Sequence, residues 1–116
     1  MGNPIVHWEI TGKDGAKLQK FYGDLFDWKI TVSEEMGDYG MVDTAAGGIN
    51  GGIMTSPEDA PPYLTIYIQV DDLQACLDKA EKMGAKTVVP PTPIPNVGSF
   101  AMFHDPEGNL VGIYKD

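Results

Sequence analysis

Residues 104–116, HDPEGNLVGIYKD, decide the fold. The DPEG tetrapeptide has the composition of a tight turn, in which Pro presets φ at the first central position and Gly relieves a strained one. The apolar runs FAMF at 100–103 and LVGIY at 110–114 flank this turn and predict the two strands of a hairpin. We expect the hairpin to close a sheet, and Gly112 in its second strand is the position on which the functional interpretation depends.

Composition and charge limit the class of protein. The chain has 116 residues, 42% of them hydrophobic, which suits one compact domain. Its net charge of −9 makes nucleic acid and membrane surfaces poor partners. Neither a secretory leader nor a bilayer-spanning run is recognisable, and the single cysteine, Cys76, cannot form an intramolecular disulfide. A cytoplasmic location is therefore expected.

The first half predicts a strand, a helix and three further strands. In IVHWEI the apolar side chains of Val6, Trp8 and Ile10 alternate with His7 and Glu9, as in a half-buried strand. A helix follows, with an apolar stripe of Leu18, Phe21, Tyr22 and Leu25. The expected elements are a strand over 5–10, a helix capped by Asp14 and ending near Phe26 or Asp27, a strand over 28–32, a turn over 33–38, and strands over 39–42 and 52–54.

The second half repeats this order after the Pro-rich break SPEDAPP at 56–62. Asp71 with Gln74 resembles a capping box, and Gly84 is placed to end the helix. The expected elements are a strand over 63–70, this helix, a strand over 86–89, a rigid loop over 90–98 and the closing hairpin. We predict one domain, 1–116, made of modules 1–56 and 57–116.

Five motifs, in this order and at these spacings, resemble those of the vicinal oxygen chelate superfamily, which includes glyoxalase, bleomycin resistance proteins and extradiol dioxygenases. They are IVHWEI at 5–10, FYGDLFDW at 21–28, YIQVDDL at 67–73, MGAK at 83–86 and HDPEGN at 104–109. The resemblance implies an α+β fold in which two consecutive βαβββ modules form a curved eight-stranded mixed sheet around a cavity, with helices on the convex side. It also implies a homodimer.

Metal-dependent members of this superfamily hold an ion with side chains from the first and last strands of each module. By the resemblance, His7 matches the first of these positions, but the second-module counterpart is Thr65, and the acidic ligand of the final strand falls at Gly112. Gly51 and Gly52 are the first-module counterparts of that position. One matching ligand cannot support a catalytic metal, so no cofactor is expected. Zinc, nickel or iron in an unorthodox site that uses Glu9 or His104 is the alternative.

The candidate site residues are those that strand alternation directs to the concave face. His7 and Glu9 share a strand face; His7 as a hydrogen-bonded interior or dimer-interface histidine is an equally weighted alternative. Glu9 needs a cavity or a partner, and is a candidate acid or base. The predicted ligand-binding residues are His7, Glu9, Thr65, Tyr67, Gln69 and Tyr114. Ordinary packing of the interior is the alternative for the last four.

We interpret the chain as a metal-free small-molecule-binding protein of the glyoxalase or bleomycin resistance type, which holds a small, partly aromatic organic compound. The first alternative is a glyoxalase-like lyase, isomerase or oxygenase that uses His7 and Glu9, with or without a divalent metal. The second is an interaction domain whose cavity is vestigial.

Overall fold

A computed structural model describes residues 2–33, 37–45, 47–58 and 60–116. These residues form eight strands and two helices in two βαβββ modules, which confirms the predicted α+β class. The elements are β1 (Ile5–Gly12), α1 (Gly15–Phe26), β2 (Lys29–Ser33), β3 (Tyr39–Asp43), β4 (Gly51–Thr55), β5 (Leu64–Gln69), α2 (Leu73–Lys82), β6 (Lys86–Ile94), β7 (Gly98–His104) and β8 (Leu110–Lys115). The predicted segments 33–38, 45–52 and 56–62 include residues 34–36, 46 and 59, which lie outside the described residues.

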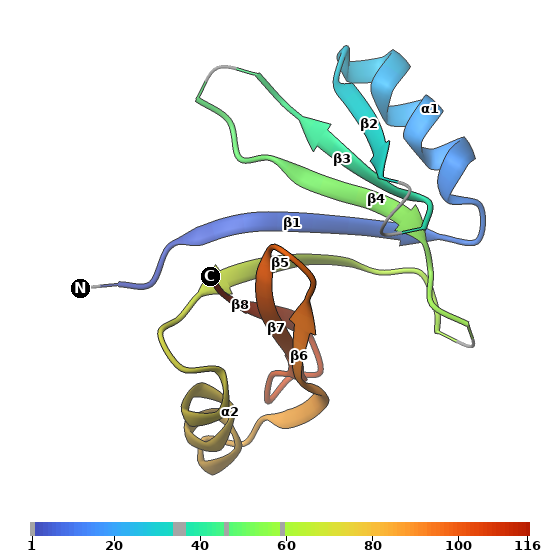
Figure 1. Cartoon of the computed structure of the whole chain (residues 1–116). Helices are drawn as coiled ribbons and strands as arrows, with labels where there is room; N and C mark the ends of the chain where they lie inside the picture. Colours follow the sequence, from blue (N-terminus) through green and yellow to red (C-terminus); the bar gives the residue numbers. More distant parts are fainter. Residues whose placement is uncertain (1, 34–36, 46, 59) are drawn as a thin grey trace. The chain divides into compact units, whose positions relative to one another are not determined.

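The chain divides into two compact units, and each is described by itself. The N-terminal unit is His7–Leu64, and the C-terminal unit is Thr65–Asp116 with Met1–Val6. In the N-terminal unit the strands follow the order β2-β3-β4-β1, with β1 parallel to β4 and the other neighbours antiparallel (Figure 1). The predicted single domain with modules 1–56 and 57–116 stays a prediction.

Helix α1 packs on one face of this sheet. Asp14 caps it as predicted, since its side chain accepts a hydrogen bond from the Lys17 backbone N–H at 3.1 Å. Gln19 then ties the helix to the sheet by donating to the backbone oxygens of Asp38 and Ile53, both at 2.8 Å. The helix ends at Phe26, and its C-cap residue Asp27 has left-handed backbone geometry.

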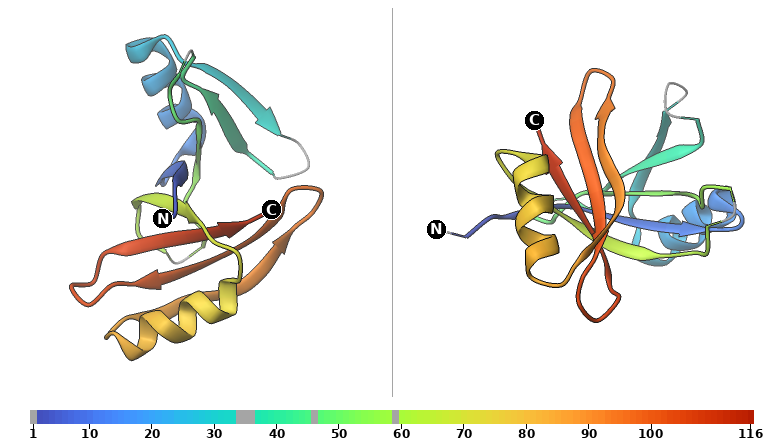
Figure 2. Two further views of the ribbon diagram at one scale, coloured as in Figure 1. Left: turned by 90° about the vertical axis from the view of Figure 1, so that its left-hand side faces the viewer. Right: turned by 90° about the horizontal axis from the view of Figure 1, so that it is seen from below.

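The C-terminal unit has the strand order β5-β8-β7-β6, with β5 parallel to β8 and the predicted closing hairpin formed by β7 and β8 (Figure 2). Helix α2 covers one face, where Leu73 and Leu77 pack on Ala101 and Ile113. In the connecting turn the Gly108 N–H donates to the Asp105 carbonyl at 2.9 Å. Hydrogen bonds donated by Asn109 to the Asp105 side chain lower the pKa of that carboxyl group.

Two local predictions are wrong in this unit. The cap of α2 is Asp72 rather than Asp71, because the Asp72 carboxylate accepts from the Ala75 backbone N–H at 3.0 Å. The predicted loop 90–98 is largely strand, since β6 runs on to Ile94. Proline is tolerated there because β6 lies at the edge of its unit's sheet and its pairing with β7 is irregular.

Candidate functional site

Apolar and polar side chains lie on opposite faces of β1, as the alternation in the sequence predicts. Trp8 lies on the helix-facing side, where its ring packs at 5.3 Å from that of Trp28, and Tyr22 of α1 stacks on Trp28 at 6.0 Å between centroids. His7 and Glu9 therefore point to the opposite face. The structure thus confirms the predicted face assignment of these two residues.

Glu9 is the buried carboxylate of this face, with 6% of its surface exposed. Two tyrosines of the same unit bind it. The Tyr39 hydroxyl donates to Oε2 at 3.0 Å, and the Tyr63 hydroxyl donates to Oε1 at 2.5 Å. Both carboxylate oxygens therefore have a phenolic donor, which compensates for much of the cost of burying the group.

His7 extends this chain of hydrogen bonds. Its Nε2 lies 2.8 Å from Tyr39 Oη, and the two rings are nearly parallel. Tyr39 has one hydroxyl hydrogen, which is directed at Glu9, so His7 Nε2 acts as the donor to Tyr39. Burial lowers the pKa of His7 below its usual value, although the negative charge of Glu9 opposes this shift. The network therefore favours a neutral imidazole with its proton on Nε2.

The two tyrosines remain neutral donors. Burial raises the pKa of Tyr39 and of Tyr63, and the charge of Glu9 and the hydrogen bonds to it raise both further. The Tyr63–Glu9–Tyr39–His7 network thus joins one carboxylate to two phenols and one imidazole. We call these four residues the Glu9 network.

Gly52 and Gly112, which stand where the resemblance implies metal ligands, face aromatic rings. Gly52 pairs with Glu9 across β4 and β1, and a Cβ on Gly52 would collide with the Tyr39 phenol. Gly112 pairs with Tyr67, and a Cβ there would collide with the Tyr67 ring. An acidic side chain does not fit at either position while these rings are in place. Among the described residues, no three His, Cys, Asp or Glu side chains gather at one point. The residues present therefore do not fit the metal centre of the metal-dependent relatives.

The other predicted site residues belong to the C-terminal unit. Tyr67, Gln69 and Tyr114 share the face opposite α2, because Tyr67 pairs with Gly112 and Gln69 with Tyr114. Tyr67 is buried and meets Phe100 edge to face. Gln69 Nε2 donates to Asp116 at 3.0 Å, and the Tyr114 hydroxyl donates to the Val97 carbonyl at 3.1 Å.

Thr65 has a structural role that the sequence analysis did not assign to it. Its side chain is buried, and its hydroxyl donates to the Leu110 carbonyl at 2.6 Å. This bond ties β5 to the first residue of β8. Within the two units, the structure brings His7 together with Glu9, and Tyr67 together with Gln69 and Tyr114.

Tyr39 and Tyr63 are the site residues that sequence reasoning missed. Alternation placed each at the start of a strand, but nothing in the sequence gave the register between β3 and β4 that brings Tyr39 to Glu9. Tyr63 is held by its backbone, whose N–H donates to the Thr11 hydroxyl at 3.1 Å. The acidic residue among the apolar side chains of IVHWEI was the available signal that a buried donor was needed.

A groove of about 660 Å³ also lies in the N-terminal unit. The residues that line it include Thr11, Leu18, Phe21, Tyr63 and Leu64. Tyr63 thus lines the groove and also donates its hydroxyl hydrogen to Glu9.

The chain belongs to the Glyoxalase/Bleomycin resistance protein/Dioxygenase superfamily, whose family model matches residues 4–113. This membership confirms the resemblance from which the fold was predicted. No helix among the described residues has the length and apolar character needed to cross a membrane.

Two relatives are similar to the chain in sequence, and one solved structure is similar to it in fold. "Putative glyoxylase CFP32" of Mycobacterium tuberculosis is 30% identical over 92% of this chain, which spans only 43% of that protein. A "Glyoxylase-like domain-containing protein" of Didymella fabae is 33% identical, with 94% of both chains covered. Methylmalonyl-CoA epimerase of Streptomyces coelicolor, solved with 2-nitronate-propionyl-CoA, superposes with a TM-score of 0.67 at 19% identity, covering 98% of this chain and 94% of that one. The last likeness concerns the fold alone.

Proposed function

We propose that this protein binds a small, partly aromatic organic molecule without a catalytic metal. The observation that carries the proposal is the aromatic filling of the glycine positions: the Tyr39 phenol lies over Gly52, and the Tyr67 ring lies over Gly112. Where metal-dependent relatives need an acidic ligand, this chain has ring surface and a phenolic hydroxyl. Such groups suit stacking and hydrogen bonding to an organic ligand.

The Glu9 network supplies the polar part of the proposed site. A ligand hydroxyl or amide that replaces one of the phenols could donate to the Glu9 carboxylate, and the neutral imidazole of His7 offers a second polar handle. In the C-terminal unit, taken by itself, Tyr67, Gln69 and Tyr114 stay predicted ligand-binding residues. Thr65 contributes less to ligand binding, because its hydroxyl already donates a hydrogen bond to the Leu110 carbonyl.

A thermal-shift screen tests this proposal. The probes are planar aromatic phenols and amides, with bleomycin included, and a compound at a hundred times its dissociation constant adds about 2.7 kcal/mol to the free energy of unfolding. We expect binders to stabilise the wild type and to stabilise Glu9→Gln much less. Lys86→Ala, an exposed change on β6, is the control and should respond as the wild type does. A compound that stabilises Glu9→Gln as strongly as the wild type would move the binding site away from the Glu9 network.

A metal-independent acid–base enzyme is the second candidate function. The observation that favours it is the continuous hydrogen-bonded chain from Tyr63 through Glu9 and Tyr39 to His7, which sets a proton acceptor beside neutral proton donors. Exchange of the α-proton of methylmalonyl-CoA into D2O, followed by NMR, is the assay. Exchange above the rate in buffer that disappears in Glu9→Gln would favour the enzyme over the binding protein.

Cytoplasmic location and homodimerisation also stand as proposals. The single cysteine, Cys76, is half-buried on α2. A free thiol of this kind is compatible with a reducing compartment. If no probe raises the unfolding temperature and no proton exchange occurs, an interaction domain without a ligand is the remaining interpretation.

A further inference from the structure

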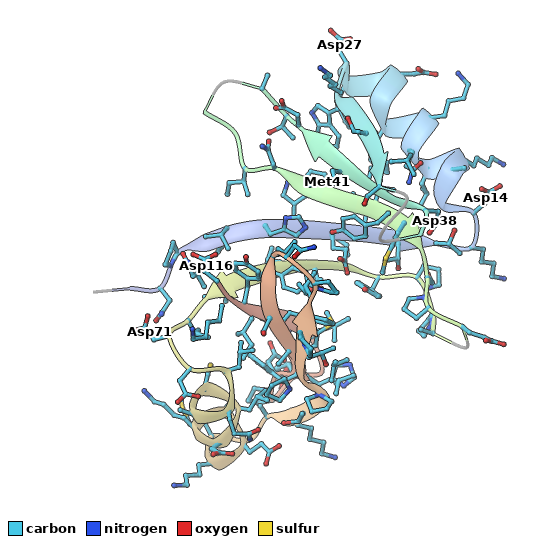
Figure 3. All side chains as sticks on the ribbon, in the orientation of Figure 1. Asp14, Asp27, Asp38, Met41, Asp71 and Asp116 are labelled. Atoms are coloured by element: carbon cyan, nitrogen blue, oxygen red, sulfur yellow. The ribbon has the colours of Figure 1, made fainter. Side chains whose placement is uncertain are left out.

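The groove of the N-terminal unit has the volume of a small-molecule site, about 660 Å³, and has no part in the proposed function. It is lined by residues 10–14, by α1 and by residues 62–64, all of which belong to His7–Leu64. Of the four residues of the Glu9 network, Tyr63 alone lines it. Asp14, which Figure 3 labels, stands at this groove where the chain turns from β1 into α1.

Hydrogen bonds hold one wall of this groove in place. The Thr11 N–H donates to the Tyr63 carbonyl at 2.9 Å, and the Tyr63 N–H donates to the Thr11 hydroxyl at 3.1 Å. The Ser56 N–H also donates to the Gly12 carbonyl at 2.8 Å. The segment 62–64 is therefore tied to β1 before any ligand binds, and a preformed groove reduces the ordering cost of binding.

Large apolar side chains line the groove and remain exposed to water. Phe21, which belongs to the predicted apolar stripe of α1, is 54% exposed, and Leu64 is 70% exposed. Leu18 of the same stripe is partly buried, and it lies so close to Gly12 that a Cβ at position 12 would collide with it. Removing exposed apolar surface from water is favourable, so the groove favours a ligand with an extended apolar body.

Lysines give the groove a positive rim. The exposed side chains of Lys13 and Lys17 line it together with Asp14, whose carboxylate caps α1 by accepting the Lys17 backbone N–H. Among the described residues, Lys20 pairs with Asp24, whereas no carboxylate lies within 4.0 Å of the Lys13 or Lys17 ammonium. Two lysines against one aspartate leave one net positive charge, in a chain whose net charge is −9. This local charge complements a ligand with a single negative charge.

We propose that this groove binds a monocarboxylate with an extended apolar body, such as a medium-chain fatty acid. The carboxylate pairs with Lys13 and Lys17, and the apolar body lies against Phe21 and Leu64. The ligand class differs from the phenols and amides proposed for the Glu9 network, because the buried Glu9 carboxylate repels an anion. The groove site therefore holds or fails independently of the proposed function.

Calorimetric titration with three matched ligands tests the charge requirement. Octanoate, octanol and octyltrimethylammonium share one apolar chain and differ in the charge of the head group. We expect octanoate to bind more tightly than the other two, although the net charge of −9 favours the cation. Moderate salt should weaken octanoate binding, because it screens the exposed lysines. Equal or tighter binding of the cation, or no binding of octanoate, would overturn the proposal.

Substitution of the two lysines locates the carboxylate. The double variant Lys13→Gln/Lys17→Gln should raise the dissociation constant of octanoate about three- to tenfold and leave that of octanol unchanged. Lys29→Gln changes an exposed lysine of the same unit that does not line the groove, so it should bind octanoate as the wild type does. An unchanged octanoate constant in the double variant would refute the pairing with Lys13 and Lys17.

A matched pair of apolar substitutions locates the rest of the ligand. Leu64→Thr removes apolar surface from the groove and should weaken the binding of both octanoate and octanol. Met83→Thr changes a residue of similar exposure, 69%, at the end of α2, and should bind both ligands as the wild type does. Circular dichroism checks that both variants are folded. Equal effects of the two substitutions would place the ligand outside the groove and refute the proposal.

Discussion

At the scale of single residues, the candidate site depends on how Glu9 is kept inside the fold. A buried carboxylate is costly unless hydrogen-bond donors reach it, and Tyr39 and Tyr63 are those donors. The sequence was sufficient to predict that Glu9 needed a partner and that it shared a face with His7. It was not sufficient to identify the tyrosines, because they come from segments thirty and fifty-four residues away.

Removing one donor should be measurable in stability. Tyr63→Phe leaves Glu9 Oε1 without its phenolic donor, and we expect the free energy of unfolding to fall by about 1–3 kcal/mol. Urea denaturation measures this. Tyr114→Phe is the matched control, because its hydroxyl bonds to an exposed carbonyl, and its effect should stay within about 0.5 kcal/mol. Equal effects of the two substitutions would argue against a special role for the Glu9 network.

The lowered pKa of His7 predicts a pH dependence of stability. At pH values below 6.5, the unfolded chain takes up a proton at His7 that the folded chain resists, so folding is favoured above pH 6.5 and weakens as the pH falls. His7→Gln should flatten this dependence between pH 7 and pH 5. A His7→Gln profile parallel to that of the wild type would contradict a buried, neutral His7.

At the scale of elements, strand register determines what the glycines do. The order of strands and helices and the closing hairpin were predictable, because they follow from local periodicity and turn residues. Register was not, since nothing local relates Tyr67 to Gly112 or Glu9 to Gly52. The α2 cap at Asp72 was missed because Asp71 and Asp72 are neighbours with the same capping chemistry. The extension of β6 to Ile94 was missed because prolines predict a loop unless the strand lies at the edge of a sheet, and strand order is not a local property.

The close approach of Tyr67 to Gly112 predicts the effect of a single methyl group. Gly112→Ala should lower the free energy of unfolding by about 1–3 kcal/mol, because the new Cβ collides with the Tyr67 ring. Adding Tyr67→Leu should recover part of this loss, since the shorter side chain leaves room. Gly2→Ala, which meets nothing within 4 Å, is the control. A Gly112→Ala protein as stable as the wild type would mean that the Tyr67 ring can move aside. Position 112 could then hold a side chain large enough to bind a metal.

At the scale of the whole molecule, family membership alone does not determine the function. The superfamily includes glyoxalases and dioxygenases as well as bleomycin resistance proteins, so the fold does not choose among binding, lyase and oxygenase functions. The proposed function is based on the side chains of the sheet faces opposite the helices, where tyrosines occupy the space over Gly52 and Gly112.

The metal content of the purified protein distinguishes a metal-free site from a metal centre at His7. Protein purified without chelator, incubated with zinc, nickel or iron and then desalted, should retain far less than one metal ion per chain by elemental analysis. Retention of one ion per chain, lost in His7→Ala but kept in His104→Ala, would contradict the metal-free account and restore a metal centre at His7.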